Sequence, residues 1–389
     1  MALPALTITF AAEEFSVGEE AFGHVLAAYI VGMALASVPA GLAADRYGPG
    51  RMLAAFFWVM AVAAGACALA TDYASLLGAH ALLGVAAGLF HPAGLSIVSL
   101  TTPAAGLGPA MGLFGVFGGV GWFTAPLLMR TALGWRAGFQ GLAVASVVGA
   151  IVCHLLMARG SVLAGPARAG DDGETDGAAT PEAGGASRPR LRSLATPRGL
   201  LLVLLLAMGV NAFLLDGFLA LYPETVGQLG ARLAEEQTLV AAVMGLGAVG
   251  QYVGGLLARD AFASSRYAVL IVLQALTLFS LAQALDRPLF PLLLMGSFAF
   301  MNFMTQPIEN KLLAGFTSAS RRSLAYALKF VVALVVALPA PLLVTSLYAR
   351  PEWGFPHLYR LLSLVGMVGV FAGIFYLRGS NRMLVRRPR

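Results

Sequence analysis

Long apolar segments alternate with short polar segments along most of the chain. A helix needs about 20 predominantly apolar residues to cross the hydrocarbon core of a bilayer, and the sequence contains eleven segments of this kind. The pattern therefore predicts eleven membrane-spanning helices, near residues 21–43, 52–70, 76–100, 108–132, 137–158, 199–222, 237–258, 267–285, 289–316, 322–348 and 355–377.

The composition supports the same class of protein. Hydrophobic residues make up 59% of the chain and charged residues only 11%, whereas a soluble globular chain carries about 25% charged residues. The mean hydropathy is +0.81. We therefore expect an all-α integral membrane protein.

Most of the positive charge lies in polar segments between the apolar ones. Arginines occur at alternate polar segments and in the C-terminal tail, while the other polar segments carry Glu or Asp. Because Lys and Arg are enriched in cytoplasmic loops, we expect the central polar segment and the C-terminus to be cytoplasmic. The net charge of +6 is then a property of these loops, and we expect no nucleic-acid partner.

One polar segment differs from the rest in length and composition. Residues 159–198 are rich in Gly, Ala, Pro and Asp and have no hydrophobic periodicity, which is typical of a disordered linker. The predicted organisation is an N-terminal bundle over 1–158, a cytoplasmic linker over 159–198, a C-terminal six-helix bundle over 199–378 and a basic tail over 379–389.

The two apolar halves are related by a constant offset of 215 positions. This offset takes Asp45 to Asp260 and Arg51 to Arg266, and it takes Pro92 to Pro307. It also superimposes two copies of the quartet "APLL", at 125–128 and 340–343. Internal repeats of this kind are common in secondary transporters, so we expect two pseudo-symmetric bundles.

The same offset predicts a short first helix. Met1 corresponds to Asp216, which lies well inside the first apolar segment of the second half. The sequence therefore predicts that the first helix of the first half is truncated at its N-terminus. Either translation begins upstream of Met1, which we favour, or the protein tolerates a partial first helix.

The segment "GLAADRYGPGR" resembles the loop that marks the major facilitator superfamily. Its residues Gly41, Asp45, Arg46, Gly48 and Arg51 match the family motif, and "GLLARDAFASSR" at 255–266 is a degenerate second copy. The resemblance covers the whole chain and implies two bundles of six helices. It also implies that the loop is a gate that opens as the halves move.

The chemistry of that loop fits either a gate or a static contact. Gly41 allows close approach of a neighbouring helix, and Gly48 allows a turn. Asp45 could accept hydrogen bonds from a helix N-terminus or pair with a nearby Arg. A permanent stabilising contact is the alternative to a gate.

Other segments resemble a bacterial branch of the family that includes fosmidomycin-resistance-type exporters. They are "GLFHPAGLSIVS", "QPIENKLL" and "AYALKF". This resemblance implies export across the cytoplasmic (inner) membrane of a bacterium. Many exporters of the family carry an Arg near the outer end of the fourth helix, where this sequence has His80.

Polar side chains inside the ninth apolar segment are the strongest functional signal. Asn302, Gln306 and Glu309 recur at i, i+4 and i+7, so they share one face of a helix. Ionisable groups inside a membrane are expensive and usually face a cavity or a partner. We expect these residues to line the central cavity, and a polar stripe sealed between helices is the alternative.

Glu309 has a predicted partner on the next helix. Lys329 lies at a comparable depth from the same end of its own apolar segment, so the two side chains could form an ion pair that relieves both desolvation penalties. The pair could be purely structural, or substrate or a proton could compete for Glu309. Its counterparts in the first half are Gly94 and Phe114, which makes the pair asymmetric.

Three further polar residues are candidates for the same cavity. Asp216 has no evident basic partner at its depth, so we expect it to contribute to proton coupling unless it is simply exposed to water. Asn211 on the same helix could bind substrate. His91 is the counterpart of Gln306, and it is either a proton-coupling residue or a neutral structural His.

These observations predict a secondary active transporter that moves a small organic molecule by alternating access. Proton-coupled export is the first expectation, on the resemblance, and ion- or proton-coupled uptake of an anionic or zwitterionic metabolite is the alternative. A membrane sensor without transport is a further possibility. No nucleotide-binding loop and no His or carboxylate pair with metal-ligand spacing occurs, so we expect neither an enzyme nor a cofactor, and we expect a monomer.

Overall fold

The computed structural model describes residues 14–17, 20–129, 134–159, 196–229, 233–287 and 289–385. Helices account for nearly all of these residues, and none of them is in a strand. Most of the predicted partial first helix and most of the predicted linker lie outside the described residues.

Eleven long segments of helix correspond to the eleven predicted spans, with the tenth one divided into α11 and α12. The helices are α2 (Glu20–Tyr47), α3 (Pro49–Ala68), α4 (Tyr73–Thr101), α5 (Ala104–Met129), α6 (Gly134–Ala158), α7 (Pro197–Gln228), α8 (Leu233–Leu257), α9 (Ala263–Ala284), α10 (Phe290–Phe316), α11 (Arg322–Ala337), α12 (Pro339–Tyr348) and α13 (Phe355–Val385). Two of the observed bounds bear on the predicted linker and tail. The helix α7 begins at Pro197, where Thr196 caps it, and α13 continues into the predicted tail as far as Val385.

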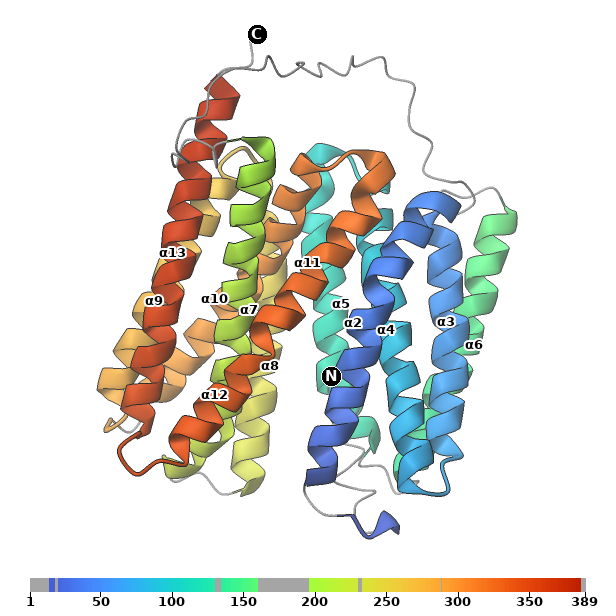
Figure 1. The fold of residues 1–389 in the computed structure, drawn as a ribbon, viewed down its shortest axis with the longest axis horizontal. Helices are drawn as coiled ribbons and strands as arrows, with labels where there is room; N and C mark the ends of the chain where they lie inside the picture. Colours follow the sequence, from blue (N-terminus) through green and yellow to red (C-terminus); the bar gives the residue numbers. More distant parts are fainter. Residues whose placement is uncertain are drawn as a thin grey trace, which may run out of the picture.

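The helices form two bundles that stand side by side (Figure 1). The first half contains α2 to α6, and the second half contains α7 to α13. In both halves consecutive helices run in opposite directions, so the loops fall at two ends. We call the end at which α6 finishes and α7 begins the linker end, and the other the hairpin end.

The helix bounds confirm the repeat predicted from the sequence. Subtracting 215 from the bounds of α10 gives 75–101, and α4 spans 73–101. The same operation on α9 gives 48–69, and α3 spans 49–68. The two halves are therefore built from the same succession of helices.

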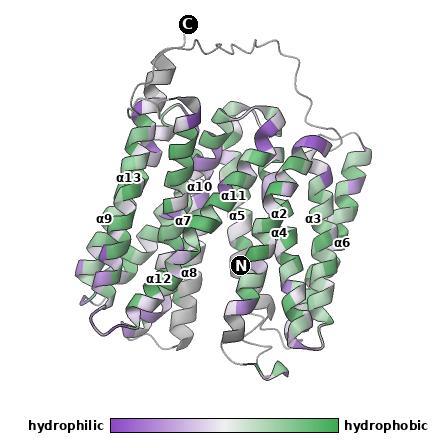
Figure 2. Ribbon diagram, viewed as in Figure 1, coloured by the Kyte–Doolittle hydropathy of each residue, from purple (hydrophilic) through white to green (hydrophobic). Residues whose placement is uncertain are grey.

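Most residues along the middle of the helices are apolar, and polar residues are more frequent at the helix ends (Figure 2). Eight of the described helical segments are long and apolar enough, by length and composition, to cross a membrane. Exposed Leu, Val and Phe side chains on these helices, such as Leu35, Val144 and Phe371, are the expected lipid-facing residues of such a protein.

The halves contact each other through close helix pairs at the linker end. The helix α5 packs on α8, and α2 packs on α11. A Cβ atom added at Gly112 on α5 would lie 2.7 Å from the backbone oxygen of Gln251 on α8. A Cβ atom added at Gly41 on α2 would lie 2.8 Å from Cβ of Ala327 on α11. Glycine therefore sets the distance between the halves, as small residues do where helices pack closely in membranes.

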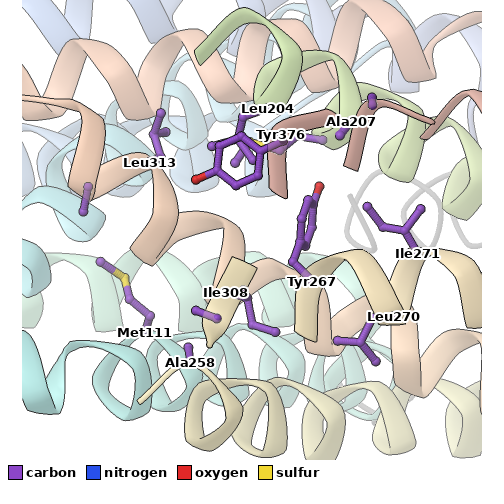
Figure 3. Packing of buried hydrophobic residues seen from close by; sticks show 14 of the residues in the cluster. Met111, Leu204, Ala207, Ala258, Tyr267, Leu270, Ile271, Ile308, Leu313 and Tyr376 are labelled. Carbon is purple, nitrogen blue, oxygen red and sulfur yellow. The ribbon is translucent and has the colours of Figure 1, made fainter. Parts of the chain in front are cut away.

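A hydrophobic core cluster continues across this interface. It joins residues of the first half, such as Leu95 and Met111, to residues of the second half, such as Leu204, Ala258 and Ile308. Figure 3 shows part of it, with Tyr267 and Tyr376 among the packed side chains. The linker end of the molecule is consequently a continuous packed body.

The tenth span breaks near its centre. Proline at position 339 lacks an N–H and its ring clashes with the carbonyl of the preceding turn, so α11 ends at Ala337 and α12 begins at Pro339. The helix α11 packs on α2, α4 and α7, whereas α12 packs on α7 and α13. Toward the hairpin end α12 and α2 diverge (Figure 1).

Candidate functional site

A cavity of about 260 Å³ lies between the two halves. The first half contributes α2 and α4 to its wall, and the second half contributes α7, α10 and α11. All seven side chains predicted from the sequence as cavity residues line it, namely His91, Asn211, Asp216, Asn302, Gln306, Glu309 and Lys329.

Glu309 is buried in the cavity wall and contacts three polar side chains. Its side chain is 4% exposed, and its Oε2 lies 3.0 Å from Nζ of Lys329. The Tyr267 hydroxyl donates to Oε1 at 3.1 Å, and Nδ2 of Asn211 donates to the same oxygen at 3.3 Å. The carboxylate is therefore held by three side chains from three different helices.

The ion pair predicted between Glu309 and Lys329 is thus present. Lys329 has a second acceptor, because Oδ1 of Asn310 lies 2.6 Å from Nζ. The hydroxyl of Tyr326 donates to the backbone carbonyl of Asn310 at 3.2 Å. A buried pair of this kind offsets its desolvation only when its remaining hydrogen-bonding atoms are also satisfied, and here both partners have additional polar contacts.

An amide network extends the polar region along α10. Nδ2 of Asn302 donates to Oδ1 of Asn211 at 2.9 Å and to Oε1 of Gln274 at 3.1 Å. Nδ2 of Asn211 donates to Oγ1 of Thr305 at 2.7 Å. Asn302 is 1% exposed and Asn211 is 6% exposed, so this part of the stripe is both packed between helices and adjacent to the cavity.

Gln306 is held from the far side of α10. Nε2 of Gln251, on α8, donates to Oε1 of Gln306 at 2.8 Å. Because Gln251 belongs to the helix that packs on α5 of the first half, this hydrogen bond connects the cavity wall with the interface between the halves.

His91 on α4 is part of the cavity wall that the first half contributes. Its ring stacks on Phe330 of α11, with ring centroids 4.1 Å apart. Its Nδ1 atom is buried and has no hydrogen-bond partner among the described residues. His91 therefore lines the cavity with its ring held against α11, and one of its ring nitrogens is buried without a partner in the described part of the chain.

Asp216 also lines the cavity, and its side chain is half-buried. It forms no ion pair with any described residue. It lies five residues beyond Asn211 on α7, which is about 7.5 Å along a helix axis toward the hairpin end.

The predicted gating loop lies at the linker end, outside the cavity. Oδ1 and Oδ2 of Asp45 accept hydrogen bonds from the backbone N–H groups of Ser323 and Leu324, at 2.8 and 3.0 Å. The first of the two chemical possibilities for Asp45 is therefore the one observed, a contact with a helix N-terminus. The contact crosses from α2 to α11 and so joins the halves.

The remaining loop residues have local roles. Gly48 has a φ of 97°, a conformation that favours glycine, at the turn into α3. The Arg46 guanidinium lies 5.2 Å from the centroid of the Tyr47 ring. Arg51 lies in the first turn of α3 with an exposed side chain.

The second copy of the loop forms different contacts. Asp260 pairs with Arg266 of its own half, with two N–O distances of 2.9 Å. Nζ of Lys311 donates to the carbonyl of Ala258 at the end of α8. The Arg266 guanidinium holds the pKa of the Asp260 carboxyl below its usual value.

His80 has no part in the cavity. The side chain is fully buried in the first half, where it packs edge-on against Phe139 and contacts Cys67. Its Nδ1 lies 2.9 Å from the carbonyl oxygen of Leu76. The described residues also contain no group of His, Cys, Asp or Glu that could hold a metal ion.

Sequence reasoning missed Tyr267, Asn310 and Gln274. Asn310 directly follows Glu309, but its position off the predicted polar face hid its contact with Lys329. Tyr267 directly follows Arg266 in the second loop copy, and only the packing of α9 on α10 brings its hydroxyl to Glu309.

Two pseudo-symmetric bundles of membrane helices with a polar cavity between them are an architecture common among secondary transporters. The model of the Major Facilitator Superfamily matches residues 1–308. The chain belongs to this superfamily.

The curated relatives align over part of the chain. An uncharacterized MFS-type transporter of Mycobacterium tuberculosis is 29% identical over 147 residues, which are 37% of this chain and 25% of the relative. The niacin transporter NiaP of Acinetobacter baylyi is 28% identical over 138 residues, 35% of this chain and 31% of the relative. The hexuronate transporter of Escherichia coli K12 is 31% identical over 130 residues, 33% and 30% of the two chains.

The aligned segments span less than a third of each of these relatives.

Solved structures match the fold over almost the whole chain. The human organic anion transporter MFSD10 has a TM-score of 0.68 at 14% identity and covers 95% of this chain and 89% of its own. The proton:xylose symporter XylE has a TM-score of 0.71 at 15% identity, with 97% and 92% covered.

Proposed function

We propose that the protein is a proton-coupled secondary active transporter of a small organic molecule. The observation that carries the proposal is the cavity between the halves, whose wall contains the buried ion pair of Glu309 and Lys329. Ionisable groups at this depth are costly in a membrane protein and mark substrate or proton pathways. Asp216 and His91 are the further coupling residues.

The linker end is the cytoplasmic end in this proposal. Arginines at the loops of that end support the assignment, because cytoplasmic loops carry an excess of Arg and Lys. They are Arg46, Arg51, Arg159, Arg259, Arg266, Arg321 and Arg322. The close contacts of α2 with α11 and of α5 with α8 then close the cytoplasmic side, and transport requires these contacts to open.

Export is the first candidate direction, and it rests on the resemblance of the helix motifs to the exporter branch. Proton antiport would drive a substrate out as protons enter through Glu309 or Asp216. The protein is then located in the cytoplasmic membrane of a bacterium and works as a monomer.

Uptake of a small anionic or zwitterionic metabolite is the second candidate. The specific observation that favours it is the ammonium group of Lys329 in the cavity wall. Two relatives are named as transporters of niacin and of hexuronate, and both compounds carry a carboxylate.

Flux through reconstituted protein tests both candidates. Proteoliposomes with an imposed pH gradient are loaded with, or bathed in, nicotinate, glucuronate and a set of lipophilic cationic dyes. We expect at least one compound to show a flux that depends on the pH gradient. Movement of that compound against the direction of proton flow indicates antiport, and movement in the same direction indicates symport.

Glu309→Gln and Asp216→Asn are measured beside the wild type, with Glu352→Gln as a control at an exposed carboxylate. Gradient-driven flux that both cavity variants retain in full would exclude their coupling roles. Binding without flux of any compound would favour a sensor instead.

A further inference from the structure

Lys329 is the one Lys or Arg in the cavity wall that the structure describes. Its ammonium group is shared between two acceptors of different chemistry, the Glu309 carboxylate at 3.0 Å and the Asn310 amide oxygen at 2.6 Å. Only the first of these acceptors carries a charge. Loss of the Glu309 charge would therefore leave Lys329 tethered by a neutral hydrogen bond, with its own charge uncompensated.

The two oxygens of Glu309 have different partners. Oε1 accepts from the hydroxyl of Tyr267 and the amide of Asn211, and Oε2 faces Lys329. A proton that binds the carboxylate therefore has its place on Oε2, because the donors to Oε1 already occupy that atom. Protonation of Oε2 and the ion pair with Lys329 exclude each other.

We propose that the cavity binds a small monocarboxylate together with one proton. The carboxylate of the ligand takes the position of Glu309 beside Lys329, and the proton binds Oε2 of Glu309. This inference rests on the second candidate of the proposed function, uptake coupled to protons, and it names the ligand class and the number of protons bound with it.

The exchange keeps the buried site neutral. Before binding, the negative charge of Glu309 balances the positive charge of Lys329. Afterwards the ligand carboxylate balances Lys329, and Glu309 is a neutral acid. No covalent bond other than the O–H bond of the acid forms or breaks. An isolated charge in low dielectric is strongly unfavourable, so proton and anion each favour the binding of the other.

Several other titratable groups surround Glu309, so the proton count must be assigned with variants as well as with the wild type. The titratable groups that face it or share its cavity are Lys329 and Tyr326 on α11, Tyr267 on α9, Asp216 on α7, His91 on α4 and Tyr29 on α2. The described parts of α5 and α8, which also pack on α10, contribute Gln251 but no titratable group to this site.

Residues of both halves surround Lys329. His91 of the first half lines the same cavity and stacks on Phe330, the residue next to Lys329. A carboxylate bound beside Lys329 would therefore lie between the two halves.

Binding of carboxylates to the purified protein in nanodiscs tests the inference. Benzoate and lactate are titrated between pH 5 and pH 8, each beside its neutral amide. The affinity of a carboxylate should fall about tenfold for each pH unit of increase, because one proton binds with each anion. The amides should bind more weakly and without this dependence. Calorimetry in buffers of different ionisation enthalpy should give one proton taken up per anion bound.

Two variants separate the roles of the pair. Glu309→Gln removes the competing charge, and it should bind the carboxylate with an affinity that does not change with pH. Lys329→Gln should lose the preference for carboxylate over amide. Glu352→Gln, at an exposed site, controls for removal of a carboxylate elsewhere.

Three results would overturn the inference. They are carboxylate binding by the wild type that is independent of pH, equal affinity for acid and amide, and failure of both carboxylates to bind the wild type at pH 5 at millimolar concentration. The calorimetric proton count needs only the wild type, so misfolding of a variant leaves the test intact.

Failure of this inference differs from failure of the proposed function. Gradient-driven flux of an uncharged or cationic compound, with no linked binding of carboxylates, would overturn the inference and support transport. Linked binding of one proton and one carboxylate, without flux in proteoliposomes, would support the inference and overturn transport.

Discussion

Asp45 and Ser323 lie 278 positions apart in the sequence, and the backbone N–H of Ser323 donates to Oδ1 of Asp45 at 2.8 Å. The contact places a carboxylate at the N-terminus of α11, where the backbone N–H groups are otherwise unsatisfied and the helix dipole favours a negative charge. A side chain of one half thereby caps a helix of the other half.

Replacing this carboxylate should favour opening of the linker end. Asp45→Asn keeps one acceptor oxygen but loses the charge and one of the two hydrogen bonds. We expect the closed arrangement to lose about 1–2 kcal/mol, which is about a 5- to 30-fold change in the equilibrium between closed and open forms. Spin labels at Tyr47 and Ser320, both exposed, would measure the distance between the halves at the linker end. In Asp45→Asn a larger fraction of molecules should show a long distance than in the wild type.

The repeat supplies the matched control for that experiment. Asp260 is the counterpart of Asp45, but it pairs with Arg266 in its own half. Asp260→Asn should leave the distance between the labels unchanged. If both variants lengthened the label distance equally, the effect of Asp45→Asn would come from general destabilisation of the protein and not from the contact between the halves.

Removing one partner of the buried ion pair should destabilise the protein. Glu309→Gln leaves the Lys329 ammonium without a charged partner, and Lys329→Met leaves Glu309 unpaired. Each single change should lower the free energy of unfolding by about 3–5 kcal/mol. The double variant should be less destabilised than the sum of the two. Thermal unfolding in detergent measures all three.

A single methyl group should be enough to disturb the contact between α5 and α8. Gly112→Ala places a Cβ atom 2.9 Å from Cα of Gly255 and 2.7 Å from the backbone oxygen of Gln251, and backbone atoms cannot rotate away. We expect a loss of about 1–3 kcal/mol and separation of the two helices, measured by label distances across them. Gly118→Ala on the same helix is the control, because nothing lies within 4 Å of its added Cβ. Equal effects of both changes would contradict the packing argument.

Glu14 and Arg136 provide a pH-dependent contact at the hairpin end. Nη1 of Arg136 lies 2.6 Å from Oε2 of Glu14, and this hydrogen bond holds the pKa of the carboxyl below its usual value of 4.5. Because the folded-state pKa is lower than the unfolded one, the contact stabilises the protein above pH 4.5 and is lost as the pH falls through the folded-state value.

Trp135 reports that transition, since its Nε1 donates to the same carboxylate at 3.1 Å. The fluorescence of the wild type should change in acid, and that step should be absent from Glu14→Gln. Glu352→Gln should retain it. A step that persists in Glu14→Gln would assign the change to another group.

The repeat and the spans could be predicted because they depend on local chemistry. Apolar length fixes where helices cross a bilayer, and anchors such as Asp45 with Asp260 and Pro92 with Pro307 fixed the register of the halves without a gap. Glu309 and Lys329 could be paired because antiparallel neighbouring helices place residues of equal depth side by side.

The rest of the site depends on packing between elements that are distant in sequence. Tyr267 reaches Glu309 from α9, and Gln274 reaches Asn302 from the same helix. No spacing rule links these positions, since the rotation of each helix about its axis decides which side chain faces α10. The difference between Asp45 and Asp260 has the same origin, because two similar loops meet different neighbours.

The break between α11 and α12 divides one membrane span into a part that contacts both bundles and a part that contacts its own. The helix α11 packs on α2 and α4 of the opposite bundle and on α7 of its own, whereas α12 packs on α7 and α13 of its own bundle. The counterpart span, α5, runs without interruption from Ala104 to Met129. If the linker end opens as proposed, we expect the tenth span to bend at Leu338, whereas α5 has no break at which to bend. The second half would then yield at a place where the first half does not.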